Sequence, residues 1–159
     1  MKRTVVSVLA LIFIFYGLAA ADVEESKQNA VYDAALAKEL GADEMGMKQY
    51  VLVILKTGPN DTSIKGKERK DLFAGHMANI GRLADEKKLA VAGPFGKNDK
   101  TYRGLFILNV ATVEEAQRLT ETDPAIKAGI FIVDLIPWYG SASLMATNDI
   151  HKRIAKQEP

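Results

Sequence analysis

The chain has 159 residues, which is room for one domain with flanking segments but not for two full domains. Its hydrophobic share of 48% and charged share of 26% are those of an ordinary globular protein and argue against disorder or a fibrous repeat. A net charge of +1 gives no sign of the basic face that nucleic-acid binders carry, and the lack of cysteine excludes disulfides, thiolate metal sites and a cysteine nucleophile.

Residues 1–21 are predicted to be a cleavable secretory signal peptide. Lys2 and Arg3 give a basic start, an apolar run follows from Val5 to Tyr16, and Ala19 to Ala21 supply small residues for cleavage. A permanent membrane helix is the alternative, but spanning needs about 20 apolar residues. The run from Val5 to Tyr16 holds only 12. We therefore expect a secreted or periplasmic protein that has no membrane contact after cleavage.

Residues 22–46 are predicted to be an N-terminal extension. Its first residues, 22–29, are polar and read as a flexible lead. A short helix is expected from Ala30 to Leu40, ended by Gly41. A helix of this length is not stable alone and must dock on the domain or on a partner.

Residues 47–141 contain the main domain, an α+β arrangement of four strands and two helices. The first strand, Met47–Lys56, is rich in β-branched and aromatic residues and apolar on both faces. A turn at 57–61 leads into the first helix. The elements that follow are a helix at Lys65–Lys88, strands at Leu89–Ala92 and Leu105–Val110, a helix after Thr112, a short helical turn at Ala125–Gly129 and a strand at Ile130–Tyr139. The order predicts a β-α-β-β-α-β, ferredoxin-like subunit.

Two helix starts have recognisable capping residues. Thr112 and Glu115 fit a capping box, in which the threonine accepts an amide hydrogen and the glutamate reaches back. Asp123 followed by Pro124 fits an N-cap with proline at the first helical position. That role alone accounts for both Asp123 and Pro124.

The predicted sheet has one face that its own helices cannot cover. Both alternating sets of the first and last strands are apolar, while two helices cover a single face. An exposed apolar face of that size is unusual for a monomer, so we expect a homodimer in which sheet packs on sheet. Residues 142–159 form a tail with a helix at about 143–156, which caps its own domain or embraces the partner.

His76 is the main candidate for a functional residue. It shares a helical stripe with Leu72, Ile80 and Leu83, so it faces the sheet. Imidazole exchanges protons near neutral pH, and a general acid or base is one interpretation. The other interpretation is a core histidine that a backbone carbonyl satisfies.

The loop from Gly93 to Arg103 is a candidate rim for a small-molecule ligand. Its residues Phe95, Asn98, Tyr102 and Arg103 are the predicted substrate-binding residues, Arg103 through a forked contact to a carboxylate or phosphate. A solvated hairpin is the alternative. No metal is expected, because the chain has no cysteine and its two histidines are far apart in the sequence; His76 together with carboxylates is the alternative. No cofactor is expected either, since the Gly93–Gly96 turn lacks the spacing of a phosphate loop.

Several runs together resemble a known family over residues 47–141. These are GHMANIGRL at 75–83, LAVAGP at 89–94, Gly104 before the third strand, and TDPAIKAG at 122–129 leading to IPW at 136–138. This pattern resembles the YciI-like (YCII-related) family of small dimeric α+β barrel proteins. The signal peptide, the extension and the tail depart from that compact pattern.

The resemblance implies a fold, an assembly and a site. The fold is a ferredoxin-like subunit that forms a dimeric α+β barrel, and the site pairs His76 with Asp123. Some relatives look like lyases that act on halogenated or hydroxylated aromatic compounds. The expectation is therefore an exported enzyme that uses His76 and Asp123 for acid/base chemistry on a small polar or aromatic substrate. The alternatives are a non-catalytic dimeric ligand-binding module and a structural or interaction role.

Overall fold

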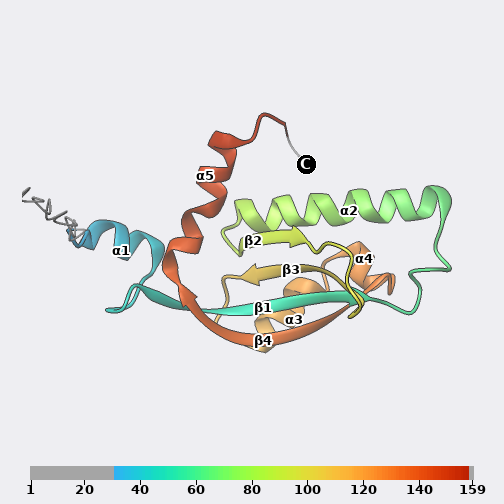
Figure 1. The fold of residues 1–159 in the computed structure, drawn as a ribbon, viewed down its shortest axis with the longest axis horizontal. Helices are drawn as coiled ribbons and strands as arrows, with labels where there is room; N and C mark the ends of the chain where they lie inside the picture. Colours follow the sequence, from blue (N-terminus) through green and yellow to red (C-terminus); the bar gives the residue numbers. More distant parts are fainter. Residues whose placement is uncertain (1–30, 158–159) are drawn as a thin grey trace, which may run out of the picture. The chain divides into compact units, whose positions relative to one another are not determined.

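The protein is built on a four-stranded antiparallel sheet with strand order β2-β3-β1-β4 (Figure 1). The structure, a computed structural model, describes residues 31–157, so the predicted signal peptide and the polar lead at 22–29 lie outside the described residues. The elements of the domain are β1 (Met47–Thr57), α2 (Gly66–Asp85), β2 (Leu89–Pro94), β3 (Tyr102–Leu108), α3 (Val113–Thr120), α4 (Pro124–Lys127) and β4 (Phe131–Ser141). The predicted β-α-β-β-α-β order of a ferredoxin-like fold is confirmed.

One face of the sheet carries the hydrophobic core. The central strand β1 turns Val51, Val53 and Leu55 toward the helices, as the period of two in a strand requires. They pack with Leu83 of α2 and Ala116 of α3, all of them buried. Figure 1 shows α2 running alongside β2, with α3 and α4 behind the strands. His76 and Asp123 thus belong to the core layer.

The opposite face of the sheet is apolar and half exposed. On this face Leu52 of β1 lies between Ile107 of β3 and Ile136 of β4. Ile132 and Ile136 are each 45% exposed, although both lie on a strand that is paired along all of β1. Lys56 of β1 and Asp134 of β4 form an ion pair at 2.6 Å. The predicted second apolar face is therefore present.

The helix α2 ends earlier than its sequence pattern predicts. We expected it to reach Lys88, but its last residue is Asp85. Lys87 has a φ of 55°, and the backbone N–H of Lys88 donates to the carbonyl of Leu83 at 2.8 Å. This closing turn satisfies the last carbonyls of the helix and sends the chain directly into β2.

The predicted capping box at Thr112 is only half formed. Thr112 Oγ1 accepts the backbone N–H of Glu115 at 3.2 Å, as expected. The Glu115 carboxylate does not reach back, because it accepts from Lys88 Nζ at 2.9 Å. A nearby cation therefore replaces the backbone amide as its partner.

The flanking segments are shorter helices than expected. The N-terminal helix α1 (Ala34–Leu40) begins four residues after the predicted Ala30, because the Asp33 side chain caps it by accepting from the N–H groups of Ala35 and Leu36. The tail holds the 3₁₀ turn η1 (Ala142–Ala146) and then α5 (Thr147–Ile154), in place of one continuous helix. In residues 31–157 we find no helix of the length and apolarity that a membrane span requires.

Candidate active site

His76 lies on the sheet-facing side of α2 among three phenylalanine rings. Its ring centroid is 6.2 Å from that of Phe73, 5.9 Å from that of Phe106 on β3 and 5.3 Å from that of Phe131 on β4. The residue is only 8% exposed. In surroundings this apolar, each buried nitrogen of the imidazole needs a specific hydrogen-bond partner.

Asp123 supplies that partner through the oxygen that its capping role leaves free. As the N-cap of α4, its Oδ1 accepts from the backbone N–H groups of Ala125 at 2.9 Å and Ile126 at 3.3 Å, with Pro124 at the start of the helix. Its Oδ2 lies 2.7 Å from His76 Nδ1. The capping role and the pairing role therefore coexist, one on each oxygen.

A polar network that the sequence analysis did not identify surrounds this pair. Asn79 Nδ2 lies 3.5 Å from Asp123 Oδ2, and Asn79 Oδ1 accepts from Arg82 at 2.8 Å and from the Thr122 hydroxyl at 3.0 Å. His76, Asn79 and Arg82 follow one another at three-residue intervals on α2. This spacing indicates that the three side chains share one face of the helix, so the sequence could have identified them as neighbours. The network thus contacts Asp123 at Oδ2, the oxygen that does not cap α4.

The hydrogen bonds define which nitrogen of His76 is free to react. Asp123 accepts backbone N–H groups at Oδ1, and its Oδ2 lies 2.7 Å from Nδ1, so the tautomer that completes this contact with a carboxylate carries its hydrogen on Nδ1 and donates it to Oδ2. Among the described residues none bonds to Nε2, and every buried side-chain nitrogen or oxygen there has a partner. Nε2 is therefore the ring nitrogen with some solvent exposure, and in the tautomer with the hydrogen on Nδ1 it has a lone pair that can accept a proton.

Arg103, a predicted substrate-binding residue, belongs to a charged cluster beside the phenylalanines. Its guanidinium lies 3.2 Å from Asp61 Oδ2 and 5.6 Å above the Phe131 ring. Arg69, which the sequence analysis missed, lies 2.7 Å from Asp61 Oδ1 and 5.0 Å above the Phe73 ring. The hydrogen bond from Arg69, and after it the charge of Arg103, lowers the pKa of the Asp61 carboxyl, and partial burial offsets only some of this effect.

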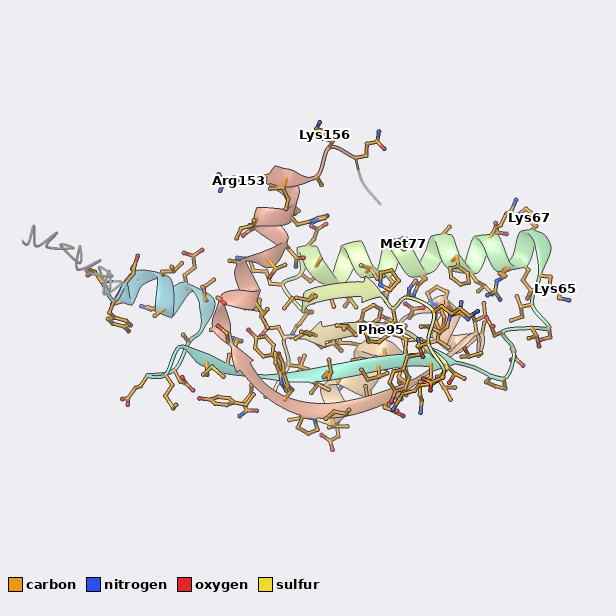
Figure 2. All side chains as sticks on the ribbon, viewed as in Figure 1. Lys65, Lys67, Met77, Phe95, Arg153 and Lys156 are labelled. Carbon is orange, nitrogen blue, oxygen red and sulfur yellow. The ribbon has the colours of Figure 1, made fainter. Side chains whose placement is uncertain are left out.

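The other predicted rim residues gather in a separate place. Asn98 organises its own loop by donating to the carbonyls of Gly96 and Tyr102 and accepting from the N–H groups of Lys100 and Tyr102. Phe95, which Figure 2 labels near the strands, pairs with the Tyr102 ring at 6.1 Å. An open recess of about 330 Å³ is lined by residues 95–100 and Tyr102. The structure thus brings His76, Asp123 and Arg103 into one region and leaves Phe95, Asn98 and Tyr102 around this recess.

The part of the chain that the structure describes holds no group of three or more histidine, aspartate or glutamate side chains placed to bind a metal ion.

Comparison with known proteins places this site in a family. The family model of the YCII-related domain matches residues 49–139. The chain belongs to the YCII-related family. The match runs from β1 to β4 and includes His76, Asp123 and Arg103, whereas α1, η1 and α5 lie outside it. The predicted family resemblance is confirmed.

Two individual proteins show similarity to this member of the YCII-related family. One is the uncharacterized protein YjpA of Bacillus subtilis (strain 168), 31% identical over 72 residues that cover 45% of this chain and 81% of the relative. The other is the structure of 5-chloro-2-hydroxyhydroquinone dehydrochlorinase (TftG) from Burkholderia phenoliruptrix AC1100 in complex with 2,5-dihydroxybenzoquinone. It is 28% identical, has a TM-score of 0.41 and covers 56% of this chain and 92% of that one.

Proposed function

We propose that this protein is a small enzyme in which His76, oriented by Asp123, accepts and returns a proton at Nε2. The 2.7 Å contact between His76 Nδ1 and Asp123 Oδ2, with Nε2 left open, is the observation that carries the proposal. In the reaction Nε2 would remove a proton from the substrate, and the electron pair left behind would expel a leaving group. The imidazolium that forms is stabilised by the Asp123 carboxylate until it gives the proton back, which is lyase-type general acid/base chemistry.

The proposed substrate is a small polar or aromatic molecule. Support comes from the aromatic surroundings of His76: Phe106 and Phe131 are buried at 4% and 5% exposure, and the partly buried Phe73 is the ring that can offer a flat apolar contact to an aromatic ligand. Further support comes from the guanidinium groups of Arg69 and Arg103, which lie over two of these rings and offer polar contacts. Apolar walls with a few polar groups are typical of small-molecule sites.

We also propose that the protein works as a homodimer and is exported. The dimer is supported by the half-exposed apolar face of the sheet, where Ile132 and Ile136 are each 45% exposed in a single subunit. Export is supported by the sequence of residues 1–21, with its basic start, apolar run and small residues. Export is tested by expressing the full chain in a bacterial host and sequencing the N-terminus of the protein recovered from the periplasm.

The proposed activity is tested by a substrate screen on the wild type and on His76→Gln. A panel of halogenated and hydroxylated aromatic compounds is followed by halide release and by absorbance. We expect a turnover that His76→Gln lowers by at least about a hundredfold, the usual contribution of a positioned general acid or base. A turnover that His76→Gln retains would contradict the assignment of His76.

A non-catalytic dimeric binding module is the second candidate. It is favoured by the segments α1, η1 and α5, which extend the chain beyond the family domain and are suited to contacts other than catalysis. Saturable binding of a panel compound by wild type and His76→Gln alike, without turnover in either, would support this candidate over the enzyme.

A further inference from the structure

We propose that Arg69 and Arg103 form a clamp for the carboxylate of an aromatic acid, and that Asp61 occupies this clamp as an internal competitor when no ligand is bound. This inference rests on the proposed function, because it assigns the substrate class of the His76 site. It concerns three residues from three different segments: the loop after β1, the first turns of α2, and β3.

The two guanidinium groups hold the two oxygens of Asp61 separately. Arg69 lies 2.7 Å from Oδ1 and Arg103 lies 3.2 Å from Oδ2, so one carboxylate bridges both arginines. Two arginines against one aspartate leave one positive charge in excess. Figure 2 shows Lys65 at the start of α2, the helix that carries Arg69, and it adds positive charge at this end of the helix, whereas the charge of Lys67 is offset by its pair with Asp71 at 2.6 Å. An incoming carboxylate therefore meets a favourable potential.

The clamp lies one aromatic ring away from His76. Arg69 stacks 5.0 Å above Phe73 and Arg103 5.6 Å above Phe131, while the same two rings lie 6.2 and 5.3 Å from the His76 ring. Phe131 is only 5% exposed, so a ligand with a single ring would lie against the partly buried Phe73, with its carboxylate at the arginines and a substituent toward Nε2. One aromatic ring thus separates the two arginines from the imidazole of His76, so a ligand with one ring could contact both.

The Arg69 half of the clamp does not need the Asp61 side chain to hold its shape. Arg69 Nη1 also donates to the backbone carbonyl of Asp61 at 2.7 Å, a contact that survives when the Asp61 carboxylate leaves. The loop backbone is anchored independently, since Asn60 Nδ2 donates to the carbonyl of Ala128 at 2.9 Å and Asn60 N–H to that of Gly129 at 2.9 Å. A ligand carboxylate can therefore replace the Asp61 carboxylate like for like.

The test is calorimetric titration of the full chain with benzoate at low salt, with benzamide as the uncharged analogue of the same shape. We expect benzoate to bind and benzamide to bind at least about tenfold more weakly, since a hydrogen bond to a charged group contributes enough free energy for that factor. Arg103→Gln should weaken benzoate binding by a similar factor. Asp61→Asn should tighten it severalfold, because the internal competitor is gone.

A matched control and a folding control keep the result interpretable. Lys67→Gln removes an exposed positive charge from the same end of α2 and should leave benzoate affinity within about twofold, because Lys67 pairs with Asp71 in solvent and does not contact Asp61. Circular dichroism melting curves of each variant show whether the fold persists. Equal affinity for benzoate and benzamide, or an Asp61→Asn variant with unchanged or weaker affinity, would overturn the clamp.

The outcome also separates the clamp from the proposed reaction. His76→Gln should bind benzoate like the wild type, because the clamp does not involve the imidazole. Failure of benzoate binding together with turnover of neutral substrates that depends on His76 would reject the clamp and keep the enzyme. Benzoate binding without any turnover would keep the clamp and reject the enzyme.

Discussion

A β-carbon built on Gly75 would lie 2.9 Å from Cγ of Pro124, closer than a side chain can approach without displacing its neighbour. α2 and α4 therefore meet at a point where only glycine fits. The next residue of α2 is His76, and the residue before Pro124 is Asp123. The contact between Gly75 and Pro124 thus sets the approach of the two helices that brings the imidazole to the carboxylate.

Gly75→Ala should destabilise the protein relative to Gly81→Ala, a change at the same kind of position in the same helix. Glycine to alanine inside a helix normally stabilises by about 0.5–1 kcal/mol, and that gain is expected at Gly81, where a β-carbon meets nothing within 4 Å. At Gly75 the clash with Pro124 offsets the gain and pushes Asp123 from His76. Urea denaturation of both variants measures the difference, and equal stability of the two would contradict the argument.

Asp123→Asn and Asp123→Ala should separate the capping role of Asp123 from its pairing role. Asparagine is as good an N-cap as aspartate, so it keeps the bonds to Ala125 and Ile126 but can no longer accept from Nδ1 with a carboxylate. We expect a loss of any His76-dependent turnover with a small loss of stability. Alanine leaves buried donors unpaired and should cost about 3 kcal/mol or more of unfolding free energy. If Asp123→Asn and Asp123→Ala had equal unfolding free energies in chemical denaturation, this division of roles would be contradicted.

The sequence was sufficient to predict the fold and to name one partner of His76. It was not sufficient to predict the charged cluster of Asp61, Arg69 and Arg103. Strand alternation and helical spacing are local patterns, so the order of elements and the inward position of His76 follow from short segments. Asp123 could be named as partner only through the family resemblance, since the N-cap alone explains an Asp-Pro step.

Arg69, Asp61 and Thr122 could not be assigned from the sequence because their partners come from other segments. Asp61 lies in a turn whose composition predicts only a turn, and its two arginines are 8 and 42 positions away. The end of α2 was predicted wrongly for a related reason. The turn at Lys87, which follows the helix, depends on where β2 joins the sheet. Contacts between distant segments decide such features.

Asp61 should make the protein more sensitive to acid. Its pKa is lowered in the folded state, chiefly by the hydrogen bond from Arg69, so its contribution to stability is complete above the pKa of the unfolded chain, about 4. That contribution is lost as the pH falls through the lower folded pKa. We expect Asp61→Asn to be less stable than the wild type at pH 7 and equal to it well below pH 4 in thermal melts. A difference between the two that does not change with pH would contradict the expectation.

The uncovered sheet face should hold two subunits together. Ile136 pairs with Leu52 in the middle of this face and is 45% exposed in one subunit, so Ile136→Asp places a charge in the proposed interface with little harm to the subunit core. Sedimentation velocity should show a dimer for the wild type and a monomer for this variant. Ile154→Asp is the control, because Ile154 on α5 is 73% exposed and lies outside the sheet. A monomeric wild type, or a dimer that Ile136→Asp leaves intact, would show that the apolar face serves another purpose than self-association.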